Sequence, residues 1–148
     1  MKIIVSELCL SDRQDWEVLY YGYAEFYEVP MNQEILDAVW AWIFDAKKSF
    51  YALIAKSGDG KAHGIMHYRE MASPLRGKLV GFLDDLYVNP KSRGHGVVDA
   101  LFQALVESAK RKGWPYVRWI TAENNYRARR VYDKIAEKTQ WITYQLKV

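Results

Sequence analysis

The stretch Leu86–Val98, with the sequence LYVNPKSRGHGVV, is the most informative part of this chain for its expected fold. It begins as an apolar strand that stops at Pro90, continues as a short basic turn with glycines, and leads at once into an amphipathic helix. In such a turn, backbone N–H groups can converge on an anion, and the dipole of the following helix adds to the attraction. The stretch therefore predicts a phosphate-binding turn between a strand and a helix.

The composition of the chain sets the limits of the interpretation. Its 148 residues fit one domain, residues 1–148, and half of them are hydrophobic, which is enough to form a core. The net charge of +3 suits a small anionic ligand and is too modest to favour nucleic acid. The only cysteine, Cys9, has no partner for an intramolecular disulfide, so a cytoplasmic location is expected. No apolar run predicts a signal peptide or a membrane span.

Periodicity and turn residues predict a chain that alternates between strands and helices. Ser11 and Gln14 form a capping-box pattern that would start a first helix, Asn32 would cap a second, and Gly113 would stop a third that begins after the glycine turn. Strands are expected at residues 3–8, 50–56, 62–71, 78–88, 117–121 and 141–146, and a last helix at residues 126–137. The strand–turn–helix–strand unit over residues 78–122 makes at least one strand pair parallel, so the sheet must be mixed.

Two motifs in this order resemble those of a known family. Arg93–Val98 matches the loop pattern Arg/Gln-x-x-Gly-x-Gly/Ala, and Asn125-x-x-Ala128-x-x-x-Tyr132 matches a second signature on the helix after the next strand. The chain thus resembles the GNAT superfamily of acyl-CoA-dependent N-acyltransferases along nearly its whole length. The acidic strand 81–88 is similar to that of the spermidine/spermine acetyltransferase-like branch. The resemblance implies an α/β (α+β) fold with a mixed central sheet of about six to seven strands and about four flanking helices.

The resemblance also implies a binding site for acetyl-CoA and no need for a metal. The residues expected to bind this co-substrate are Leu86, Tyr87, Val88, Arg93, Gly94, His95, Gly96, Val97, Val98, Asn125 and Tyr132. Val98 departs from the family pattern, which has a small residue at this position so that the pyrophosphate can approach the backbone. The Gly-Phe pair that usually follows the last helix is also absent. The departure at Val98 bears on the affinity for the co-substrate.

Three residues are expected to carry the chemistry that the resemblance implies. A backbone N–H near Leu86 would stabilise the oxyanion, Tyr132 would protonate the departing thiolate, and Asp84 would attract the substrate ammonium and take its proton. Because neighbouring residues of a strand point to opposite faces, Asp84 is expected to share a face with Leu86 and Val88, away from Asp85. Alternatively, Tyr132 is only a packed aromatic residue, and either aspartate only a structural ion-pair partner.

The sequence therefore predicts an N-acetyltransferase that uses acetyl-CoA and the primary amine of a small molecule, such as a polyamine or an amino acid. The amine would attack the thioester directly while both substrates are bound. Two alternatives stay open: a non-catalytic coenzyme A-binding regulatory module, and an acetyltransferase acting on a protein lysine or N-terminus. No membrane partner is expected, and a homodimer is compatible with the resemblance.

Overall fold

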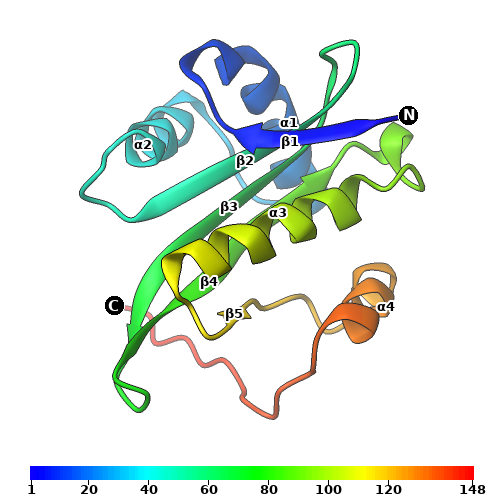
Figure 1. The fold of residues 1–148 in the computed structure, drawn as a ribbon. Coiled ribbons are helices and arrows are strands. Elements are labelled where there is room, and N and C mark those ends of the chain that lie inside the picture. Colours follow the sequence, from blue (N-terminus) through cyan, green and yellow to red (C-terminus); the bar gives the residue numbers. More distant parts are fainter.

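A mixed sheet of five strands in the order β1-β2-β3-β4-β5 organises the fold (Figure 1). The computed structural model describes residues 1–148. The strands are β1 (Ile3–Glu7), β2 (Phe50–Ser57), β3 (Ala62–Ser73), β4 (Lys78–Val88) and β5 (Val117–Arg118), and the helices are α1 (Arg13–Phe26), α2 (Gln33–Ile43), α3 (Val97–Lys112) and α4 (Tyr126–Ile135). Neighbouring strands are antiparallel up to β4, and β4 and β5 are parallel because α3 returns the chain to the same end of the sheet. No helix is both long and apolar enough to cross a membrane.

Helices cover both faces of the sheet, and each face has its own apolar cluster (Figure 1). On one face, α1 and α2 bury Trp16 and Leu36 against the sheet. On the other face, α3 buries Leu101 and Leu105 against strand residues such as Met66. Since full burial of one such side chain is worth roughly 1.5–3 kcal/mol, the two clusters hold β3 and β4 firmly between helical layers.

The predicted helix cap at Asn32, the predicted helix end at Gly113 and the predicted extent of β4 are confirmed. The Asn32 side chain accepts a hydrogen bond from the backbone N–H of Ile35 at 2.9 Å and so caps α2. Gly113 ends α3 in a left-handed conformation, with φ of 75°. β4 runs over Lys78–Val88, as predicted.

Some predicted boundaries are wrong. The first helix begins at Arg13, because residues 10–12 form a separate 3-10 turn in which the Asp12 carboxylate accepts from the backbone N–H of Cys9, so Ser11 is no cap. β5 ends at Arg118, since the chain diverges there from β4, and α4 ends at Ile135. The strand predicted at residues 141–146 is absent, since no backbone hydrogen bond joins this segment to the sheet, and the sheet has five strands instead of the six to seven expected.

Candidate functional site

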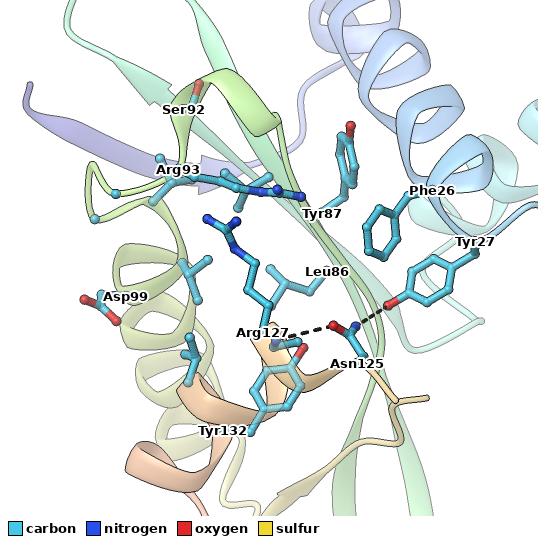
Figure 2. Close-up of a pocket in the computed structure, with 17 residues that line it drawn as sticks. Phe26, Tyr27, Leu86, Tyr87, Ser92, Arg93, Asp99, Asn125, Arg127 and Tyr132 are labelled. Carbon is cyan, nitrogen blue, oxygen red and sulfur yellow. Dashed lines mark hydrogen bonds between the residues drawn. The ribbon is translucent and has the colours of Figure 1, made fainter. Parts of the chain in front are cut away.

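A cavity of about 300 Å³ lies between the end of β4, the glycine turn and α4 (Figure 2). The structure brings together here all the residues predicted to bind the co-substrate except His95, which is exposed and outside the lining. The lining comprises Phe26, Tyr27, Leu86, Tyr87, Val88, Ser92, Arg93, Gly94, Gly96, Val97, Val98, Asp99, Asn125, Arg127, Ala128, Val131 and Tyr132. Sequence reasoning missed Phe26 and Tyr27, which reach the cavity from α1, because no local signal marks a contact this distant in the chain.

The glycine turn opens the N-terminus of α3 onto the cavity. Gly94 and Gly96 have φ of 81° and 80°, a left-handed conformation that side-chain-bearing residues rarely adopt. The buried Ser92 anchors the turn from behind, since its hydroxyl lies 2.7 Å from Nδ1 of His63. The first N–H groups of α3 have no acceptor inside the helix, so they are available to an anion in the cavity.

Two arginines place positive charge beside this turn. Figure 2 shows the side chains of Arg93 and Arg127 extending into the cavity toward each other. Neither of them takes part in a salt bridge. Two neighbouring cations without a carboxylate partner repel each other, and an anion bound between them would relieve that repulsion.

Val98 forms part of the cavity wall without filling the cavity. Its side chain is half-buried and packs against the cluster of apolar residues under α3. The cavity is open beside it. A β-branched residue at this position is therefore compatible with a ligand-sized space at the turn.

Asn125 and Tyr132 enter the cavity from α4. The Asn125 side chain caps this helix by accepting from the backbone N–H of Ala128 at 3.3 Å, and its amide donates to the Tyr27 hydroxyl at 3.5 Å (Figure 2). Tyr132 packs against Phe102 and Trp119, with ring centroids 6.2 and 5.4 Å away. Burial raises the pKa of Tyr132 to about 12, so its hydroxyl is protonated at neutral pH. That hydroxyl makes no hydrogen bond within the protein and faces the cavity near Leu86.

A second cavity, of about 550 Å³, lies beside Asp84 and Asp85 of β4, under α1 and α2. Its lining combines carboxylates, cations and apolar side chains: Tyr20, Val39, Trp42, Lys48, Phe50, Arg69, Glu70, Asp84 and Asp85. Residues 84–85 line this cavity, and the next three residues of the same strand line the first one. The two cavities therefore adjoin along β4.

A β-bulge places both aspartates in the second cavity. The strand register pairs His67 with Asp85 and Tyr68 with Leu83, so Asp84 is an extra residue without an opposite partner. Such an insertion breaks the alternation of side chains along a strand. The predicted placement of Asp84 on one face with Leu86 and Val88, away from Asp85, is therefore wrong.

The surroundings of the two aspartates shift their pKa values in opposite directions. Burial raises the pKa of Asp84, and the charge of Arg69 offsets this only in part. Arg69 Nε lies 3.2 Å from Asp84 Oδ2, but the approach lacks hydrogen-bond geometry, and this buried oxygen has no hydrogen-bond partner. For Asp85, burial also opposes ionisation, but hydrogen bonds from His67, Tyr23 and Tyr20 outweigh it and hold the pKa below its usual range.

His67 orients Asp85 through a buried hydrogen-bond chain. The indole N–H of Trp16 donates to Nε2 of His67 at 2.8 Å, and His67 Nδ1 lies 2.9 Å from Asp85 Oδ2. Because an indole N–H can only donate, Nε2 must accept, and the ring proton sits on Nδ1 and is donated to Asp85. The Tyr20 hydroxyl donates to the same carboxylate oxygen at 2.9 Å. His67 is thus a structural partner of Asp85.

Comparisons with known proteins agree on one family. Residues 16–136 match the model of the acetyltransferase (GNAT) family. The chain is 30% identical over 145 residues to the D-amino-acid N-acetyltransferase HPA3 of Saccharomyces cerevisiae, a match that covers 97% of this chain and 90% of the yeast protein.

Solved structures share the fold at low identity. AAC(6')-Iy, solved with a bisubstrate analogue of coenzyme A and acetylneamine, has a TM-score of 0.87 at 19% identity, covering 100% of this chain and 99% of the other. A ribosomal-protein-alanine N-acetyltransferase from Brucella melitensis biovar Abortus 2308 has a TM-score of 0.82 at 22% identity, covering 100% of both chains.

Proposed function

Because this chain belongs to the GNAT family of acetyltransferases, we propose that its first cavity binds acetyl-CoA and that its second binds an amino acid or a similar carboxylate-bearing amine. The observation that carries this proposal is that the two cavities adjoin along β4, where residues 86–88 line the first and residues 84–85, at the bulge, line the second. The enzyme would join an acetyl donor in the first cavity to an amine in the second.

The first cavity suits the donor in charge and in backbone geometry. The free N–H groups at the start of α3, together with Arg93 and Arg127, would hold the diphosphate. β4 pairs with β5 only at Gly81 and Phe82, so the backbone edge of residues 86–88 is open on that side. An extended pantetheine arm would add along this edge like a short strand.

The second cavity suits a zwitterionic amine better than a polyamine. Asp84 and Asp85 offer negative charge to an ammonium group, whereas Lys48 and Arg69 offer positive charge to a carboxylate. Apolar groups such as Trp42 would cover the rest of the acceptor. A polyamine has no carboxylate, so it would gain no ion pair from Lys48 and Arg69. The yeast relative, a D-amino-acid N-acetyltransferase, supports the same acceptor class.

The residues around the bulge would carry the chemistry. Bound acetyl-CoA supplies an activated acetyl thioester. Asp84 accepts the proton that the ammonium must lose, and the freed amine forms the new C–N bond at the acetyl carbonyl and then gives its second proton to solvent. Backbone N–H groups near Leu86 stabilise the oxyanion. Tyr132 then donates its proton to the sulfur as the C–S bond breaks, and it regains a proton from solvent.

An acceptor panel tests this proposal. We expect free coenzyme A to be released from acetyl-CoA with amino acids, and much more slowly with the matching amino-acid amides, which keep the amine but lack the carboxylate. Arg69→Ala should narrow this difference, whereas Arg76→Ala, which removes an arginine outside both cavities, should leave it unchanged. A preference for polyamines, or for protein lysines and N-termini, would contradict the proposed acceptor.

A non-catalytic module that binds coenzyme A is the second candidate, favoured by Val98 in place of a small residue. It predicts that coenzyme A raises the melting temperature while no amine in the panel is acetylated. It also predicts that Tyr132→Phe changes neither property. Turnover with any acceptor rules this candidate out.

We also propose that the enzyme acts in the cytoplasm. Cys9, its only cysteine, is exposed and unpaired, as is usual for proteins kept under reducing conditions.

A further inference from the structure

A buried histidine of β3, His63, holds both ends of the short segment that leads into the glycine turn. This segment includes a 3-10 helix over Pro90–Ser92, and the chain continues from it into Arg93. The backbone carbonyl of His63 accepts from the N–H of Asn89 at 2.8 Å, and the ring nitrogen Nδ1 lies 2.7 Å from the Ser92 hydroxyl. One residue of the sheet thus clamps the segment at its start and at its end.

The partners on the far side of the ring determine which nitrogen carries its proton. Nε2 of His63 lies 2.7 Å from the Ser57 hydroxyl, which donates to the Asp59 carboxylate. The same hydroxyl lies 3.4 Å from the carbonyl oxygen of Lys61, which is also only an acceptor. Hydrogen bonds from Ser57 and from the Lys61 N–H hold the pKa of Asp59 below its usual range, so this carboxylate is charged at neutral pH. Because the Ser57 proton is used on that side, its oxygen must accept from Nε2–H of His63.

The other ring nitrogen must therefore be the acceptor of the Ser92 proton. With the proton of neutral His63 on Nε2, Nδ1 carries a lone pair, and the Ser92 hydroxyl donates to it. Both residues are buried, at 5% and 6% exposed, so solvent does not compete for this bond. A buried donor that loses its acceptor costs free energy, so the chain from Ser92 through His63 to Ser57 favours one arrangement of the segment.

This clamp ends where the anion site begins. Figure 2 shows the Ser92 hydroxyl pointing away from the first cavity, whereas the side chain of the next residue, Arg93, extends into it. Ser92 thus fixes the point at which the backbone leaves the 3-10 helix. The chain then passes through Gly94 and Gly96, whose backbone has many accessible conformations. A fixed starting point limits the conformations of this turn before any ligand arrives.

We propose that His63 is a positioning residue of the co-substrate site, which pre-sets the glycine turn through Ser92 and thereby strengthens binding of the diphosphate. This inference rests on the proposed function, which assigns acetyl-CoA to the first cavity. It goes beyond that function because His63 lies outside the cavity lining. A turn that is ordered in advance loses less conformational freedom on binding, so the clamp contributes to affinity and not to the chemical step.

Calorimetry with coenzyme A tests the clamp on matched variants. Ser92→Ala removes the donor to His63, and the dissociation constant should rise about five- to tenfold, as expected for the loss of one hydrogen bond. The control is Ser108→Ala, because Ser108 is also a buried serine, bonds to the Tyr68 hydroxyl at 2.9 Å and lies outside both cavities. It should lower the melting temperature to a similar extent but leave the dissociation constant unchanged.

Substitutions of His63 itself show whether the two residues act as one unit. His63→Leu should weaken binding by a factor similar to that of Ser92→Ala, and the double variant should bind little worse than either, since both changes remove the same bond. His63→Asn supplies an amide oxygen as a substitute acceptor and should recover part of the affinity. Should His63→Leu fail to fold, the comparison of Ser92→Ala with Ser108→Ala decides the question alone.

Steady-state kinetics separate positioning from chemistry. In Ser92→Ala the KM for acetyl-CoA should rise by the same factor as the dissociation constant, while kcat is unchanged. S-acetylpantetheine is a donor without the diphosphate, so Ser92→Ala and the unchanged protein should use it equally well.

Several results would overturn the role of His63: unchanged affinity in Ser92→Ala, an equal loss in Ser108→Ala, a lower kcat in place of a higher KM, or an equal slowing with S-acetylpantetheine. A protein that binds coenzyme A but acetylates no amine would refute the proposed function, and calorimetry would still decide the clamp. A protein that does not bind coenzyme A at all would contradict both.

Discussion

Asp84 and Asp85 are sequence neighbours in one cavity, yet their charges have opposite effects on the native state. Burial makes the charge of Asp84 costly, and its oxygen Oδ2 is left without a hydrogen bond. Donors from His67 and Tyr20 make the charge of Asp85 favourable. Pairs of carboxyl groups whose pKa values are separated by their surroundings commonly divide the chemical work. We therefore infer that Asp84 exchanges the proton while Asp85 holds a steady negative charge.

Asp84→Asn is expected to stabilise the protein while it slows the reaction. Since the pKa of Asp84 is raised on folding, the native state loses stability as pH rises through the ordinary carboxyl range toward the raised value. A neutral amide removes this cost, so the melting temperature at pH 7 should rise. The turnover number should fall by about 10²-fold or more, because no group takes the proton from the amine. Thermal unfolding and initial rates measure the two effects, and a lower melting temperature would contradict the assignment.

Asp85→Asn is expected to destabilise the protein, in contrast to Asp84→Asn. Because the pKa of Asp85 is lowered on folding, its charge stabilises the native state above the ordinary carboxyl pKa, and that gain disappears as pH falls through the lowered value. Replacement should cost about 1–3 kcal/mol at pH 7, since buried donors lose a charged acceptor. Denaturant unfolding at pH 7 and at acidic pH measures this loss, which should shrink in acid. Asp133→Asn, at an exposed position, is the control.

Tyr132→Phe tests the proposed proton donor in the first cavity. Thiolates leave fairly easily, so we expect the turnover number to fall by about 10²-fold or less. The Michaelis constant for acetyl-CoA should change little, because the ring and its packing remain. With its pKa raised to about 12, Tyr132 stays protonated in ordinary buffers, and it should add no alkaline limb to the pH–rate profile. Tyr126→Phe, an exposed change on the same helix, should leave the rate unaltered.

Among the elements, the glycine turn at residues 94–96 combines a left-handed backbone conformation with a position in the wall of the first cavity. Gly96→Ala forces a side chain into the left-handed conformation, at a cost of roughly 1–2 kcal/mol, although the space around it is open. We expect lower stability together with weaker binding of coenzyme A in calorimetry. Gly60→Ala is a matched control, because Gly60 has φ of 86° and open space but lies in the β2–β3 turn, away from both cavities. Equal effects of the two variants on binding would mean that the turn at Gly96 does not touch the ligand.

The elements show how far the sequence predicts this fold and where local patterns fail. β4 and the start of α3 are predicted correctly because a proline, two glycines and a clear apolar periodicity mark them. The bulge at Asp84 is missed because it depends on how β4 pairs with β3, which no local pattern records. The contact of Tyr27 with the first cavity is missed for the same reason, because Tyr27 lies almost a hundred residues before its hydrogen-bond partner Asn125. The strand pattern at residues 141–146 is present, but the segment makes no backbone hydrogen bond to the sheet.

At the scale of the whole molecule, α1 links the two cavities. Tyr20, in its middle, lines the second cavity, while Phe26 and Tyr27, at its end, line the first. Tyr87 lines the first cavity while its ring packs against Tyr23 of the same helix, at 6.4 Å between centroids. A displacement of α1 on binding one substrate would therefore alter the site for the other. The two binding events are expected to be coupled.

The same arrangement predicts direct transfer, with both substrates bound before either product leaves. The protein's only cysteine lies outside both cavities, between β1 and α1, so it is not placed to form an acetyl-enzyme. Initial rates measured at several fixed acceptor concentrations should give intersecting reciprocal plots, and Cys9→Ser should keep full activity. Enzyme incubated with acetyl-CoA alone should release no burst of coenzyme A and gain no acetyl mass. Parallel plots, or an acetylated residue that passes its group to an added amine, would show instead that the two cavities work in turn through a covalent intermediate.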